Sequence, residues 1–121
     1  MSVIVGISAD SDFVLANAGY RVLKEIAFSR TDNREDRRIL EAAGWAHILD
    51  LTTLKSERAR RIAWLLDEAA QIRIEALQAE EGTQESPAGA AHYEAFQAQL
   101  RKAFGRPPDL LSRSGEPALR T

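Results

Sequence analysis

Two aspartates, Asp10 and Asp12, directly follow the short β-branched run VIVGI at positions 3–7. A carboxylate pair after a strand can hold Mg²⁺ for phosphoryl chemistry, because hard oxygen ligands suit hard cations. Such a site also needs a lysine and further acidic residues on neighbouring strands, and those strands exist only in the α/β alternative described below. Ser11 or Asp12 serves equally well as the cap of a following helix, and this structural interpretation is the one we adopt.

A second chemical candidate is the pair of His47 and Asp50, three positions apart and within reach across one helical turn. A histidine–carboxylate pair can act in acid–base catalysis, but no serine in a tight turn and no second histidine lies nearby to complete a nucleophilic set. The chain also has no cysteine and no glycine-rich phosphate loop. We therefore expect a non-catalytic protein without a metal ion or other cofactor.

The helix predicted over 54–81 carries its charges in the order opposite to the one favoured by the helix dipole. Its first turns hold four basic residues against Glu57, and its later turns hold five acidic residues against Arg73. The basic group is Lys55, Arg58, Arg60 and Arg61, and the acidic group is Asp67, Glu68, Glu75, Glu80 and Glu81. Three explanations are open: screening of exposed charges by solvent and salt, antiparallel pairing with a second copy, or an anionic partner at the basic end.

Trp64 lies beside Arg60 on the polar side of this helix, off the main apolar stripe, unless it lies along the edge of a wide core stripe. An aromatic residue next to arginines has the composition of an interface hot spot. The residues predicted to bind a partner are therefore Arg58, Arg60, Arg61 and Trp64, with Glu75, Glu80 and Glu81 as the complementary surface. Replacing Arg60 and Arg61 by Glu is expected to abolish binding and to leave thermal stability nearly intact.

Nucleic-acid binding is the alternative use of the same basic residues. The stretch 39–62 resembles a helix-turn-helix in outline, with a Thr-Thr junction and an arginine-bearing second helix. It lacks the expected glycine-containing turn, and the whole chain has a formal net charge of −2. We therefore rank this alternative below protein binding, and a metal-dependent enzyme using Asp10 and Asp12 below both.

Apolar periodicity predicts a mainly helical fold, a small domain of three or four helices with a short N-terminal strand at 3–7. Helices are expected over 12–30, from about 32 through 43, over 54–81, and from the Ser86-Pro87 start to Gly105. A lone strand leaves its backbone unsatisfied, so strand 3–7 needs a partner from this chain or from another copy.

Two segments leave the fold class open. Residues 15–26 (LANAGYRVLKEI) and 40–51 (LEAAGWAHILDL) align without gaps. Either Gly19 and Gly44 lie inside helices, or they end helices in an α/β fold with strands near 3–7, 20–28 and 45–52. We adopt the helical interpretation, because 25 residues are few for a helix–strand unit.

Length and composition complete the expectations. The 121 residues, 45% apolar and 28% charged, predict one globular domain at 1–105 and a mobile C-terminal tail at 106–121. The start of the chain has no basic region typical of a signal peptide, and no apolar run is long enough to span a membrane. We expect a cytoplasmic protein-binding module, such as a small inhibitor, an immunity-type protein or an adaptor, whose partner is another protein or its own copy in an antiparallel homodimer.

Overall fold

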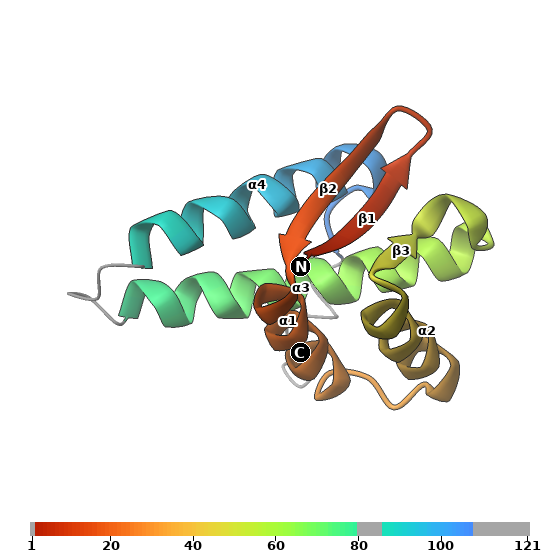
Figure 1. Ribbon diagram of the computed structural model, residues 1–121, viewed down its shortest axis with the longest axis horizontal. Helices are drawn as coiled ribbons and strands as arrows, with labels where there is room; N and C mark the ends of the chain where they lie inside the picture. Colours follow the sequence, from red (N-terminus) through yellow and green to blue (C-terminus); the bar gives the residue numbers. More distant parts are fainter. Residues whose placement is uncertain (1, 80–85, 108–121) are drawn as a thin grey trace, which may run out of the picture.

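The chain forms a β-hairpin, two helices, a short third strand and two long helices, as Figure 1 shows for the computed structural model. The structure describes residues 2–79 and 86–107. The elements are β1 (Ser2–Ser8), β2 (Ser11–Ala16), α1 (Asn17–Phe28), α2 (Arg34–Ala46), β3 (Ile48–Asp50), the 3₁₀ turn η1 (Leu51–Thr53), α3 (Ser56–Ala79) and α4 (Ser86–Phe104). The prediction of a mainly helical domain with an N-terminal strand is confirmed.

The three strands form one mixed sheet in the order β2-β1-β3. β1 pairs with β2 antiparallel, with Ile4 opposite Val14, and with β3 in parallel, with Ile4 opposite Ile48. The partner that strand 3–7 requires is thus supplied by this chain. Alternate residues of β1, such as Val3 and Val5, point into the core, so the helices cover one face of the sheet and leave the other open.

The prediction of a helix over 12–30 is wrong for its first five residues, which belong to β2. Leu15 does fall at helical spacing from Val22, but it is buried equally well on a strand, where Phe13 and Leu15 share the inner face of the sheet. Pairing with β1 satisfies backbone groups that a lone strand would leave exposed. Asp12 is therefore not a helix cap; α1 begins after Ala16, which makes no side-chain capping bond.

The helical interpretation of the two aligned segments is confirmed. Residues 20–28 lie in α1, and Gly19 and Gly44 lie within α1 and α2. The second segment changes structure at His47, whose left-handed backbone (φ 63°) ends α2. Only the three residues of β3 within 45–52 form the strand that the α/β alternative proposed.

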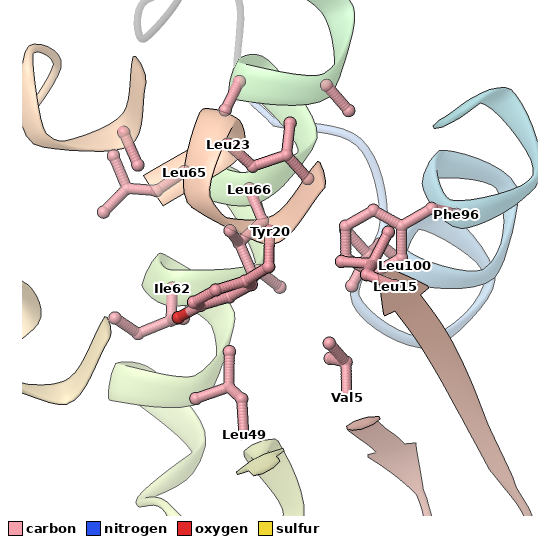
Figure 2. Packing of buried hydrophobic residues seen from close by; sticks show 14 of the residues in the cluster. Val5, Leu15, Tyr20, Leu23, Leu49, Ile62, Leu65, Leu66, Phe96 and Leu100 are labelled. Atoms are coloured by element: carbon pink, nitrogen blue, oxygen red, sulfur yellow. The ribbon is translucent and has the colours of Figure 1, made fainter. Parts of the chain in front are cut away.

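Helix α3 is the centre of the packing, as the convergence of side chains in Figure 2 shows. Residues 65–70 are all buried, so the middle of α3 is covered on every side. Side chains of the sheet, α1 and α4 meet there: Val5, Leu15, Tyr20, Leu23, Ile62, Leu66, Phe96 and Leu100. Helix α4 starts at Ser86 and ends before Gly105 (φ 78°), as expected. Residues 108–121, with most of the predicted tail, lie outside the described residues.

Candidate functional site

Two of the arginines predicted to bind a partner meet a buried carboxylate of the same chain. Asn33 caps α2 by accepting a hydrogen bond from the Asp36 N–H at 2.9 Å, which places Asp36 in the first turn. The Asp36 side chain is 0% exposed and accepts hydrogen bonds from Arg58 Nη1 and from Arg61 Nε, the latter at 2.9 Å. The pairing with Asp36 raises the pKa of Arg61 above its ordinary value. Both arginines hold α3 against the start of α2.

Acidic residues in the middle of α3 are paired in the same way. Asp67 is buried and accepts two hydrogen bonds from Arg101 of α4, at 2.9 and 3.0 Å, and a third from Gln97. Glu68, also buried, forms an ion pair with Arg30 at 3.3 Å. The reversed charge order of α3 thus has an explanation that the sequence analysis did not consider: much of it serves contacts with neighbouring helices.

The sequence did hold a signal for this arrangement. Asp36, Leu40 and Ala43 are spaced four and three residues apart, on one face of α2, and all three are buried. A carboxylate on an apolar face requires a charged partner when it is buried. Arginines elsewhere in the chain were the available partners.

Arg60 and Trp64 remain together on α3. The Arg60 guanidinium lies 5.9 Å from the centre of the Trp64 ring, and Arg60 is exposed while Trp64 is half-buried. Glu75 is exposed and accepts a hydrogen bond from Gln71 at 3.0 Å. Glu80 and Glu81 lie outside the described residues. Of the predicted binding set, the structure therefore brings Arg58 and Arg61 together at Asp36. It also places Arg60 beside Trp64.

Asp10 and Asp12 lie in and after the hairpin turn and are exposed. With Asp50 of β3 they line a shallow cavity of about 350 Å³ above the open face of the sheet. Asp50 Oδ1 already accepts hydrogen bonds from the Thr52 N–H (3.0 Å) and hydroxyl (2.6 Å). Within residues 2–79 and 86–107, no group of three or more acidic, histidine or cysteine side chains is arranged to hold a metal ion.

His47 and Asp50 do not hydrogen-bond to each other, and each has a local structural role. His47 ends α2, and its carbonyl accepts a hydrogen bond from the Ile4 N–H at 3.1 Å. Asp50 caps η1. The Asp50 carboxylate bonds to the Thr52 hydroxyl rather than to His47, so the predicted histidine–carboxylate pair is not formed.

The open face of the sheet carries a feature that the sequence analysis missed. Ile4, Val14 and Ile48 lie side by side across the three strands and are 41%, 49% and 49% exposed. Period-two alternation in β1 could have indicated Ile4, but the row exists only because three separate strands align in this register.

Trp45, at the end of α2, is the most exposed large apolar residue of the described chain, at 80%. Its indole N–H donates to Glu41 at 3.3 Å, and Glu41 also forms an ion pair with Lys24 of α1. These residues line a crevice of about 250 Å³ between α1 and α2, together with Arg21.

Comparisons of the chain with protein-family models, curated proteins and solved structures find no match. The fold itself defines a small, mainly helical domain with a three-stranded mixed sheet that is open on one face. Of the helices in the described segments, none has the length and apolar character needed to cross a membrane.

Proposed function

We propose that this protein is a non-catalytic protein-binding module, and that it binds its partner through the open face of the sheet. The row formed by Ile4, Val14 and Ile48 carries this proposal. Contiguous apolar side chains on a surface expose area whose burial is favourable, and such patches mark interaction sites. An inhibitor, an immunity-type protein or an adaptor would each use a surface of this kind.

Acidic residues beside the row indicate the chemistry of the partner. Asp12 and Asp50 flank Gly6 on the same face, one on each neighbouring strand. Asp10 lies in the adjoining turn, and no arginine or lysine lines this cavity. A partner surface that combines apolar and basic side chains would therefore complement this face.

The charged face of α3 is a second contact region within the same proposal. Arg60 beside Trp64 retains the arginine–aromatic composition of a hot spot. Arg58 and Arg61 form ion pairs with Asp36, and this neutralisation lowers the positive potential that a nucleic acid would meet. The outline of a helix-turn-helix is also interrupted, since β3 and η1 lie between α2 and α3. Protein binding is thus the better supported of the two functions.

The test is capture of partners from a lysate of the native host by the tagged chain, with and without nuclease. Ile4→Lys places a charge in the centre of the row, and Ile72→Lys places the same charge at an exposed isoleucine of α3 as the matched control. We expect wild type and Ile72→Lys to capture a discrete protein that nuclease treatment does not remove. Ile4→Lys should fail to capture this protein. Equal capture by both variants would contradict binding at the sheet, and recovery only of nuclease-sensitive material would favour the nucleic-acid alternative.

A further inference from the structure

We infer that the partner adds an extended strand to the free edge of β2. This inference rests on the proposed function and specifies how the open face is used. Strand addition supplies main-chain hydrogen bonds for affinity and alternate side chains for specificity.

The direction of the backbone groups on β2 follows from one hydrogen bond. The Ile4 N–H donates to the His47 carbonyl at 3.1 Å, so the N–H and C=O of Ile4 point toward β3. Ile4 and Val14 are consequently a non-hydrogen-bonded pair in the antiparallel β1–β2 ladder. The N–H and C=O of Val14 therefore point away from β1, toward the free edge, and those of Asp12 do the same because the pattern repeats every two residues.

These outward groups have no partner in the described part of the chain. No hydrogen bond of residues 2–79 or 86–107 reaches the backbone of Asp12 or Val14 from the free side. Proteins commonly protect such edges with lysine, proline, a bulge or a covering segment. β2 contains no lysine or proline, and its pairing is regular from Asp12 to Ala16. Among the described residues, this edge therefore has backbone groups that another strand could pair with.

Helix α4 packs beneath this edge of the sheet. The Phe13 ring lies 5.0 Å from the ring of His92 and 5.2 Å from that of Phe96, so α4 crosses directly under β2. Figure 1 shows α4 running on past β2, on the side away from β1. A single added strand would rest on this helix.

The residues along the edge indicate the sequence of the added strand. Asp12 and Val14 favour a basic and an apolar side chain beside them. At the end of β2, the start of α1 has no side-chain cap and no acidic residue in its first turn, so a carboxylate beside Ala16 would be favoured there. The added strand would thus present basic, apolar and acidic groups at alternate positions, two residues apart.

The probe for the test is a displayed library of random 12-residue peptides selected on the full-length protein. Val14→Pro removes an N–H that has no partner within the sheet, whereas Val14→Thr keeps this N–H and the branched shape. We expect enriched peptides with the alternating pattern, whose affinity falls about tenfold or more for Val14→Pro and much less for Val14→Thr. Enriched peptides that bind Val14→Pro as tightly as wild type, or no enrichment at all, would overturn strand addition.

Backbone amide exchange gives a readout that does not depend on a variant. In the free protein, the amides of Asp12 and Val14 should exchange rapidly, while those of Phe13 and Leu15 are protected by β1. Bound peptide should slow exchange at Asp12 and Val14 about tenfold or more, and unchanged exchange would overturn the inference. If Ile4→Lys loses partner binding while Val14→Pro binds fully, the result would support the proposed function and contradict strand addition.

Discussion

The guanidinium of Arg61 holds the buried carboxylate of Asp36 through two hydrogen bonds, Nε to Oδ2 at 2.9 Å and Nη2 to Oδ1 at 3.3 Å. Arg58 binds the same carboxylate from one turn earlier in α3. The basic start of α3, which opposes its own dipole, is thus matched to an acidic group at the start of α2. This relationship ties together two helices that are separated in sequence by β3 and η1.

Removing both arginines should destabilise the fold. The double substitution Arg58→Met and Arg61→Met leaves Asp36 buried without a positive partner, which costs about 3–5 kcal/mol of unfolding free energy. Adding Asp36→Asn should recover about 1–3 kcal/mol, because a neutral amide is cheaper to bury. Urea unfolding measures both changes. Arg60→Met, at an exposed position, is the control and should shift stability by less than about 0.5 kcal/mol; a double variant as stable as this control would contradict the role of Asp36.

Charge reversal at Arg60 separates binding by the α3 face from folding. Arg61→Glu would place a second carboxylate against Asp36, so the pair of reversals at positions 60 and 61 should lower stability, contrary to the sequence-based expectation. Arg60→Glu alone removes the cation beside Trp64 and should change the unfolding free energy by less than about 0.5 kcal/mol. If the α3 face contributes to partner binding, affinity should fall about fivefold or more. Capture titration with Arg60→Gln alongside shows whether loss of charge or its reversal matters, and unchanged affinity for both variants would exclude Arg60 from the interface.

The burial of the Tyr20 phenol leads us to expect a loss of folding stability at alkaline pH. Burial, with a smaller contribution from Glu41, raises the pKa of the Tyr20 phenol far above its ordinary value, so the folded state favours the neutral form. This contribution is fully present below the unfolded pKa of about 10 and is lost progressively as pH rises above it. Tyr20→Phe should remove this part of the pH dependence and cost about 1 kcal/mol at neutral pH, through loss of the 2.7 Å hydrogen bond to the Leu40 carbonyl.

The measurement is unfolding free energy between about pH 8 and about pH 12, with Tyr93→Phe as the matched control. An equally steep alkaline decline in Tyr20→Phe and wild type would show that another group is responsible.

The two glycines within α1 and α2 should respond differently to alanine. A Cβ at Gly44 would meet only ordinary contacts, the nearest being Tyr20 Cε2 at 3.6 Å, so Gly44→Ala should stabilise the protein by up to about 1 kcal/mol. A Cβ at Gly19 would lie 3.1 Å from the Tyr93 hydroxyl, which must shift, so Gly19→Ala should gain less or destabilise. Thermal unfolding of the two variants decides this, and a larger gain at position 19 would contradict the close approach of Tyr93 to Gly19.

The helix boundaries show which structural features can be predicted from signals within a short stretch of sequence. The start of α4 at Ser86, its end before Gly105 and the long stripe of α3 were all predicted, because capping residues and helical periodicity act within a few neighbouring residues. Strand β2 was missed because Leu15 satisfies both a helical and a strand pattern. Pairing with β1 decides between them, and that pairing is not visible in either segment alone.

The candidate site divides in the same way. Residue types alone supplied the charge order of α3 and the closeness of Arg60 to Trp64, since these depend on spacing along one helix. Tertiary structure alone decided that Arg58 and Arg61 share Asp36, and that Ile4, Val14 and Ile48 form one exposed row. The physical reason is distance along the chain: these contacts join segments that approach each other only when burial of the common core around α3 brings the sheet and helices together.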